Sequence, residues 1–391
     1  MKKKIKIGDI CDILNGFAFK SDKYVSSGIR VIRITNVQKG YLEDSTPQYY
    51  PLETISELEK YMLNEGDLLM SLTGNVGRVA LLTANMLPAA LNQRVACLRI
   101  KDSRIIDKGF LFQFLNSDYF ELQCILSSKG IAQKNMSTEW LKEYEIPIFT
   151  KEEQKQISLE LSKVDFLITA RHEQLAKLDE LVKARFVELF GDPVLNPKKW
   201  TVSELSAHIQ FLTSGSRGWS QYFTDSGEYF ITIKNVKNCR ITLDDVQYVV
   251  PPDNAEAKRT RVQEGDLLIS ITADLGRTGV ITKEIADYGG YINQHLICIR
   301  LNQDAVRPLY VAYYMESEAG KSQFQAKNQS AVKAGLNFNS INSLRLIVPP
   351  IELQDKFISF VEQTDKSKLA IQKSLEKLET LKKALIQKYF G

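Results

Sequence analysis

The sequence lacks the signals of membrane, secreted and disulfide-stabilised proteins. Its 391 residues contain no run of eighteen or more apolar residues, so no transmembrane helix is expected. The basic start MKKKIKIGDICDIL has neither an apolar core nor a small-residue cleavage site, so it is not a secretory signal. The five cysteines form no CxxC pair and have no histidines at ligand spacing. These absences argue against a disulfide framework or a zinc site and favour a reducing cytoplasm.

Signals for catalysis are also absent. No GxxxxGK[ST] or GxGxxG loop occurs, and EAGKS at 318–322 has Met315 where a P-loop requires its first glycine. The sequence has no Asn/Asp-Pro-Pro-aromatic segment, which a DNA amino-methyltransferase would need. A Ser–His–Asp grouping around one of the three histidines stays open, without a GxSxG elbow to support it. The sequence therefore predicts a binding protein that lends specificity to enzymes on other chains.

Charge of one sign is not in excess. The chain has 51 Lys and Arg residues and 47 Asp and Glu residues, for a net charge of +4. This balance does not by itself indicate nucleic-acid binding, but it permits binding if basic side chains gather on one face. Hydrophobic residues make up 44% of the chain, so each half is long enough to bury a core of its own.

An internal repeat organises the chain. EGDLLMSLTGNVGR at 65–78 matches EGDLLISITADLGR at 264–277 at nine of fourteen positions. Further matches keep nearly the same offset and pair ITNVQKG with IKNVKNC, LNQRVACLRI with INQHLICIRL, and the FG of 190–191 with the FG of 390–391. The chain is therefore one unit of about two hundred residues used twice, which suits a pseudo-two-fold molecule.

Each copy begins with a globular part that mixes strand and helix patterns. The runs ACLRI, LICIR and GDLLMSL are typical of strands, and they end at Gly, Asn or Asp. The segment 109–126 carries apolar residues at helical spacing and predicts a helix on the core face. We therefore expect α+β globular domains over 1–150 and 192–350.

Each copy ends with a heptad pattern. Residues 151–189 contain no glycine or proline, and their apolar residues alternate at spacings of four and three, which indicates a coiled-coil seam. Arg171 and Arg185 fill two seam positions. The expected seam residues are Ile157, Leu161, Val164, Ile168, Leu175, Leu178, Val182 and Leu189, and then Phe357, Val361, Ile371, Leu375, Leu378 and Leu385. We predict long helices over 151–191 and 351–391 that pair antiparallel; the alternative is that each folds back onto its own domain.

The repeated loop has two interpretations. Gly74-Asn75-Val76-Gly77-Arg78 follows a predicted strand, and its amides and arginine could bind a phosphate. The alternative is a tight turn between core strands, with a solvated arginine. The second copy keeps Gly276 and Arg277 but replaces the first two residues by Ala and Asp. The turn is favoured for the glycines, and both interpretations stay open for the two arginines.

The order of these segments resembles a known family. GDLLMSLTGNVGR, LNQRVACLRI, IPIFTKEEQKQI and a heptad helix ending ELFGDP follow one another and then recur in divergent form. This order resembles the specificity subunit of Type I restriction–modification systems, over essentially the whole chain. The resemblance implies two similar α/β target recognition domains (1–150 and 192–350). They would be joined by conserved spacer helices (151–191 and 351–391) in a pseudo-two-fold antiparallel coiled coil.

The resemblance also implies function and partners. Each globular domain would read one half of a bipartite site in double-stranded DNA, and the coiled coil would set the spacer between the halves. Two modification subunits would supply S-adenosylmethionine and adenine methylation, and restriction subunits would add ATP- and Mg-dependent translocation and cleavage. This chain would carry no catalytic residue, cofactor or metal, and it would act in the cytoplasm.

Candidate DNA-binding residues follow from chemistry, because Arg, Lys, Asn and Gln read base edges and bind phosphates. The candidates are Lys20, Ser21, Arg33, Asn75, Arg78, Arg94, Lys129, Gln133 and Lys134 in the first domain, and Ser216, Arg217, Lys234, Arg277, His295, Lys327 and Lys333 in the second. The alternative for each is a solvated surface side chain. His295 stands where Arg94 stands, and a polar position that differs between copies is a better candidate for base reading. Asn36, Asn235, Asn92 and Asn293 recur at equivalent positions, which indicates roles in turns.

Two other functions compete with DNA recognition. The chain could be a single-chain methyltransferase or nuclease with an unrecognised site, or a coiled-coil adaptor that links proteins. The DNA sequence read and the spacer length do not follow from these residues.

Overall fold

The computed structural model describes residues 3–128, 136–329 and 335–391. Two compact units divide the chain: unit 1 comprises Met1–Glu173 with Ile371–Gly391, and unit 2 comprises Gln174–Ala370. Two 40-residue helices, α5 (Lys151–Phe190) and α11 (Ile351–Phe390), each contribute one half to each unit. Within the described ranges, no helix has both the length and the apolar character needed to cross a bilayer.

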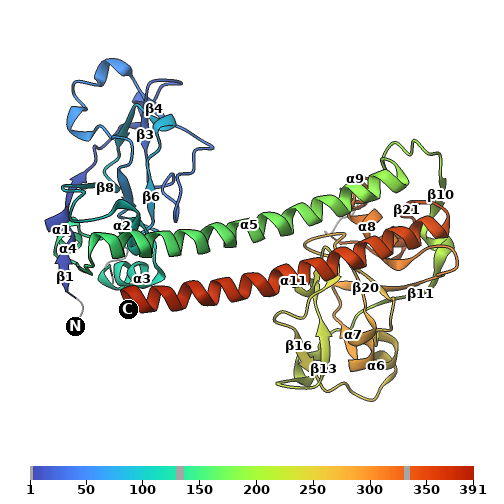
Figure 1. Ribbon diagram of the computed structural model, residues 1–391. Helices are drawn as coiled ribbons and strands as arrows, with labels where there is room; N and C mark the ends of the chain where they lie inside the picture. Colours follow the sequence, from blue (N-terminus) through green and yellow to red (C-terminus); the bar gives the residue numbers. More distant parts are fainter. Residues whose placement is uncertain (1–2, 129–135, 330–334) are drawn as a thin grey trace. The chain divides into compact units, whose positions relative to one another are not determined.

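Unit 1 is built on a four-stranded antiparallel sheet in the order β2-β8-β5-β6 (Figure 1). A second sheet has the order β4-β3-β7, and β1 pairs with β9. The strands are β1 (Lys4–Lys6), β2 (Cys11–Asn15), β3 (Ile29–Ile32), β4 (Tyr49–Tyr50), β5 (Leu68–Ser71), β6 (Val79–Leu81), β7 (Ala89–Leu91), β8 (Val95–Ile100) and β9 (Glu145–Pro147). The shorter helices are α1 (Ile7–Ile10), α2 (Lys108–Leu115), α3 (Asp118–Ser127) and α4 (Thr138–Glu143).

The helix expected over 109–126 is in fact two helices. Ser117 ends α2 and begins α3, because its hydroxyl donates to the carbonyl of Phe114 (2.6 Å) and accepts the N–H of Phe120 (3.2 Å). A serine that bonds the backbone in this way caps a new helix. The apolar spacing correctly predicts a core face, since Phe110, Leu111, Phe114 and Leu115 are buried, but it does not reveal the break at the capping serine.

Unit 2 repeats the strand order of unit 1 and adds β15 and β14 to the main sheet and β12 to the second sheet. Its main sheet has the order β11-β20-β17-β18-β15-β14, the second sheet has the order β12-β16-β13-β19, and β10 pairs with β21. The strands are β10 (Thr201–Glu204), β11 (Ile209–Ser214), β12 (Phe223–Thr224), β13 (Glu228–Ile231), β14 (Val236–Lys237), β15 (Cys239–Ile241), β16 (Gln247–Val249), β17 (Leu267–Ser270), β18 (Thr278–Val280), β19 (Gly290–Ile292), β20 (Leu296–Leu301) and β21 (Arg345–Val348). The shorter helices are α6 (Ala255–Thr260), α7 (Lys283–Tyr288), α8 (Pro308–Glu316), α9 (Glu318–Gln329) and α10 (Phe338–Asn342). The α+β expectation is confirmed for both copies.

The long helices have clear start and stop signals. Thr150 forms a capping box with Glu153: its N–H donates to Glu153 Oε2 (2.9 Å), and its hydroxyl accepts the Glu153 N–H (3.3 Å). Gly191, with φ +83°, ends α5 in the left-handed conformation that favours glycine. Both helices begin where the sequence predicted and end one residue earlier.

A recurring glutamine ties each long helix to its globular part. Buried Gln154 accepts the N–H of Asp107 (2.7 Å) and donates to the carbonyls of Ile105 (3.0 Å) and Phe149 (2.9 Å). Gln354 makes the corresponding three bonds in unit 2. Because a buried amide that loses its partners is costly, each helix start is held firmly against the loops it bonds.

Within each unit the two long helices run antiparallel. In unit 1, Lys382 Nζ lies 2.6 Å from Asp165, and in unit 2 Lys368 pairs with Asp179. The two aspartates are fourteen residues apart on α5, and the two lysines are fourteen residues apart on α11 in the opposite direction. One antiparallel register therefore accounts for both ion pairs. The predicted antiparallel pairing is confirmed within each unit.

Burial along the seam is uneven. The buried seam residues are Ile157, Leu161, Val164, Val182, Phe357 and Val361, and the half-buried ones are Ile168, Leu175, Leu178, Leu189, Ile371, Leu375, Leu378 and Leu385. The helix ends also join the globular cores: Ile386 and Phe390 belong to the core of unit 1, and Phe186 and Phe190 to that of unit 2. The alternative that each helix folds back onto its own domain is therefore wrong for half of each helix.

Candidate nucleic-acid interface

Loops gather at one end of the main sheet in unit 1. Strand β2 ends at Asn15 and β5 at Ser71, at the end where β8 begins with Val95. The second sheet joins the same end, because the N–H of Asn92 donates to the carbonyl of Ile32 at 3.1 Å. The loops after β2, β3, β5 and β7 therefore start together, and we call this group the loop end of unit 1.

Four candidates lie in these loops. Arg33 follows β3, Asn75 and Arg78 lie between β5 and β6, and Arg94 precedes β8. Asn75 and Arg94 are exposed, whereas Arg33 and Arg78 are half-buried. Lys20 and Ser21 are exposed around a short 3-10 turn further along the loop after β2.

The repeated Gly-rich loop is a tight turn. The hydroxyl of Ser71 accepts the N–H of Arg78 (3.0 Å), and its carbonyl accepts the N–H of Gly77 (3.0 Å). Gly77 has φ +82°, and a Cβ there would lie 2.8 Å from Cys124 Cβ, so only glycine fits. Gly276 and Ser270 repeat this turn in unit 2. Because the amides of Gly77 and Gly276 are already bonded within the protein, the turn interpretation is confirmed for these two glycines.

The EGD part of the repeat is also structural. Asp67, 4% exposed, accepts two hydrogen bonds from Arg99 (2.9 and 2.6 Å) and one from the Asn64 N–H (2.8 Å). Asp266 repeats this arrangement with Arg300.

Burial and the nearby Asp266 carboxylate raise the pKa of the Cys298 thiol well above its ordinary value, so this thiol stays neutral.

The recurring asparagines close turns, as predicted. Asn36 Oδ1 accepts the N–H of Arg33 (2.9 Å), and Asn235 Oδ1 accepts that of Thr232 (2.9 Å). Asn92 and Asn293 accept the N–H two residues ahead in the same way (3.1 and 3.2 Å). These side chains shape the loop end of each unit.

In unit 2 the corresponding loops bring fewer candidates to the surface. Arg217 and Lys234 are exposed, and Arg277 forms an ion pair with Asp274 at 2.5 Å. His295 Nδ1 lies 2.8 Å from the Thr272 hydroxyl. Ser216 is only 2% exposed and bonds the Thr260 hydroxyl (3.1 Å), so its predicted contact with DNA has no accessible group in this structure.

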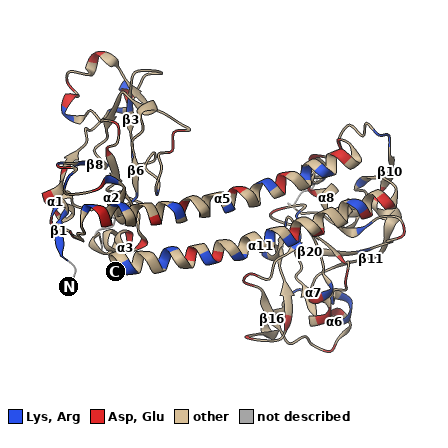
Figure 2. Ribbon diagram, viewed as in Figure 1, with Lys and Arg blue, Asp and Glu red and all other residues tan. Residues whose placement is uncertain are grey.

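The remaining candidates lie elsewhere. Lys327 is on α9, where its amine contacts the Ser343 hydroxyl at 2.5 Å. Lys129, Gln133, Lys134 and Lys333 lie outside the described residues. Figure 2 shows basic and acidic residues interspersed along both α5 and α11.

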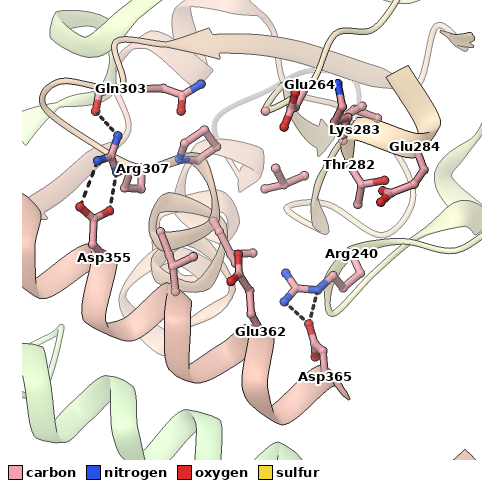
Figure 3. A pocket seen from close by; sticks show the side chains of 16 residues that line it. Arg240, Glu264, Thr282, Lys283, Glu284, Gln303, Arg307, Asp355, Glu362 and Asp365 are labelled. Carbon is pink, nitrogen blue, oxygen red and sulfur yellow. Dashed lines mark hydrogen bonds and ion pairs between the residues drawn. The ribbon is translucent and has the colours of Figure 1, made fainter. Parts of the chain in front are cut away.

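A hollow of about 660 Å³ lies beside α11 in unit 2 (Figure 3). Arg307 bonds Asp355 (2.6 Å), Arg240 bonds Asp365, and the other charged lining residues are Glu264, Lys283, Glu284 and Glu362. Both arginines are paired, and carboxylates outnumber the remaining cation. The hollow therefore does not suit a phosphate.

No catalytic grouping emerges from the described residues. Three or more metal-ligating side chains gather nowhere in residues 3–128, 136–329 or 335–391. His208 Nε2 lies 3.0 Å from the Ser203 hydroxyl, but its other ring nitrogen has no carboxylate partner in the described part of the chain. A Ser–His pair without an orienting acid does not complete a triad.

Comparisons with known proteins agree on one family. A family model described as the Type I restriction modification DNA specificity domain matches residues 2–180 and 197–383. The EcoBI specificity subunit of Escherichia coli is 21% identical over 99% of this chain and 85% of its own length. The EcoAI specificity subunit of Escherichia coli is 31% identical over 46% of this chain, which spans 32% of that relative. The crystal structure of a Type-I restriction-modification system S subunit from M. genitalium shares the fold (TM-score 0.61, 16% identity, 100% of this chain and 96% of that chain).

Proposed function

Because the chain belongs to the family of the Type I restriction modification DNA specificity domain, we propose that it is the DNA-recognition subunit of such a complex. Each unit reads one half of a bipartite site in double-stranded DNA. The chain supplies sequence specificity and performs no catalysis.

One observation carries this proposal: both units display different polar side chains on the same loop scaffold. The turns around Ser71 and Ser270, and those around Asn92 and Asn293, have matching hydrogen bonds. Between these fixed points Asn75 gives way to Asp274, and Arg94 to His295. A constant scaffold with variable polar groups is what reading two different half-sites requires, because bases differ in their donors and acceptors.

We further propose that the paired helices set the spacer between the two half-sites. Each helix is continuous over 40 residues and spans about 60 Å at 1.5 Å per residue. Gln154 and Gln354 anchor each helix start, which supports a stiff connection. Two weak readers on a stiff connection bind jointly with high effective concentration when the spacing fits.

Two modification subunits dock on this scaffold. On α5 in unit 1, Phe166 is 72% exposed and lines an apolar hollow of about 420 Å³ with Ser162, Lys163 and Leu167. On α11, Leu369 is also exposed, three residues beyond Lys366, which is the repeat equivalent of Phe166. Large apolar side chains on an exposed helix face indicate a protein contact.

Catalysis and cofactors belong to the partners. The modification subunits carry S-adenosylmethionine and methylate adenine, and restriction subunits use ATP and Mg for translocation and cleavage. The chain acts in the cytoplasm, where these partners meet the DNA.

Binding-site selection with the complex of this chain and its modification subunits tests the proposal. We expect one bipartite sequence with a fixed spacer, and no methyl transfer from labelled S-adenosylmethionine by this chain alone. Methyl transfer by the chain alone would support the enzyme alternative. A complex that forms but shows no sequence-selective binding would support the adaptor alternative.

A further inference from the structure

The turn Asn92–Arg94 is held rigidly at the loop end of unit 1. The N–H of Arg94 donates to Asn92 Oδ1 (3.1 Å), and its carbonyl accepts the N–H of Leu72 (3.0 Å). Gly16 backs the turn so closely that a Cβ would lie 2.2 Å from the Asn92 carbonyl oxygen. The backbone of Arg94 is therefore fixed before any ligand arrives.

Unit 2 builds the same turn with another side chain at its tip. The N–H of His295 donates to Asn293 Oδ1 (3.2 Å), and its carbonyl accepts the N–H of Ile271 (3.0 Å). Gly215 backs this turn as Gly16 backs the first, with a Cβ 2.1 Å from the Asn293 carbonyl oxygen. Identical backbones thus present arginine in one copy and histidine in the other.

Arg94 also differs from the other arginines of its domain. Five of the six arginines before residue 150 bond their guanidinium groups to other groups of the protein; the pairs are Arg30–Asp44, Arg33–Thr46 O, Arg78–Gln38, Arg99–Asp67 and Arg104–Asp102. The Arg94 side chain is exposed and has no such partner among the described residues. Binding a ligand through Arg94 therefore breaks no side-chain hydrogen bond with the residues that the structure describes.

We propose that Arg94 reads a guanine through the major groove in the half-site bound by unit 1. This proposal rests on the proposed DNA-recognition function. The two parallel N–H groups of a guanidinium match O6 and N7 of guanine, and a fixed backbone limits the entropy lost on docking.

Phosphates are the other partner that an exposed arginine can take, and the repeat distinguishes the two. Phosphate contacts carry no sequence information, so both half-sites need them equally. Arg78 recurs as Arg277, as a phosphate contact should, whereas Arg94 is replaced by His295. A tip residue that changes while its scaffold stays constant fits base reading.

Binding-site selection with Arg94→Ala, in complex with the modification subunits, tests the proposal. We expect the preference for guanine to disappear at one position of one half-site, with about ten- to hundred-fold weaker binding to the wild-type site. Arg94→Lys keeps the charge but loses the paired donors, so it should lose most of the guanine preference while keeping nonspecific binding.

Arg104→Ala is the matched control. Arg104 is also exposed (89% of the side chain), lies in the same unit, and bonds Asp102 beyond the opposite end of β8. Its substitution should leave base preference and affinity unchanged. The proposal would be overturned if Arg94→Ala lost the same amount of affinity for all DNA sequences. It would also be overturned if the Arg94→Ala complex assembled normally and kept its preference for guanine. If the wild-type complex itself selected no sequence, the DNA-recognition function would fail instead.

Discussion

Phe390, at the end of α11, packs edge-on against Phe114 of α2 with ring centroids 5.2 Å apart. Phe390 also contacts Phe110 in the same way, at 5.7 Å. A helix that begins in unit 2 thus completes the core of unit 1. In unit 2, Phe190 of α5 packs similarly against Tyr310, at 4.8 Å.

Phe390→Ala should lower the free energy of unfolding of unit 1 by about 3–5 kcal/mol, because it leaves a cavity among buried aromatic rings. Urea denaturation followed by intrinsic fluorescence measures the change, with Trp140, in the same cluster of rings, as reporter. Leu381→Ala, on the exposed face of α11, is the control and should cost well under 1 kcal/mol. An equally small loss for Phe390→Ala would show that the helix end does not support this core.

The two ion pairs between α5 and α11 have the same charge orientation. Both aspartates, Asp165 and Asp179, lie on α5, and both lysines, Lys368 and Lys382, lie on α11. Lys382→Asp should destabilise unit 1 by about 1 kcal/mol by opposing like charges, and Asp165→Lys in the same chain should restore most of it. Thermal unfolding of the four members of this double-mutant cycle, at low and high salt, measures the coupling. If the stability changes caused by the two single substitutions simply added up in the double variant at low salt, the coupling between Asp165 and Lys382 would be contradicted.

Stability should depend on the protonation of His208. Partial burial lowers the pKa of His208, so the folded state favours the neutral ring. The stability that the folded state gains by keeping this ring neutral is fully present above the pKa of the unfolded state, about 6.5. It is lost as the pH falls through the lower pKa of the folded state. We therefore expect His208→Gln to flatten the decline in unfolding free energy between about pH 7 and pH 5. If the unfolding free energies of wild type and His208→Gln declined in parallel with pH, this role of His208 would be ruled out.

Phe166 should matter for assembly and not for folding. Because its ring is largely exposed, Phe166→Asp should leave the melting temperature nearly unchanged but weaken binding of modification subunits at least about tenfold. Titration calorimetry or analytical ultracentrifugation measures the binding. Tyr41→Asp, at another exposed apolar residue of unit 1, is the control and should bind normally. Normal assembly of Phe166→Asp would place the docking surface elsewhere.

Sequence by itself determined the local elements of this protein. The duplicated order of segments, the strands around GDLL, the two heptad helices and the turn-forming asparagines all follow from patterns within a few residues of one another. Hydrophobic period, capping residues and turn chemistry act over that range, which is why they can be read directly. The break at Ser117 belongs to the same class, although a continuous apolar pattern concealed it.

Only the tertiary structure decided which side chains are available and which cores the helix ends complete. Ser216 is buried and bonds Thr260, 44 residues away, and Arg78 bonds Gln38, 40 residues away, while Arg94 is left exposed. Likewise, Phe390 meets Phe114 across more than two hundred and fifty residues of chain. Availability and core membership depend on what packs nearby in space, and that is set by long-range contacts that no local pattern contains.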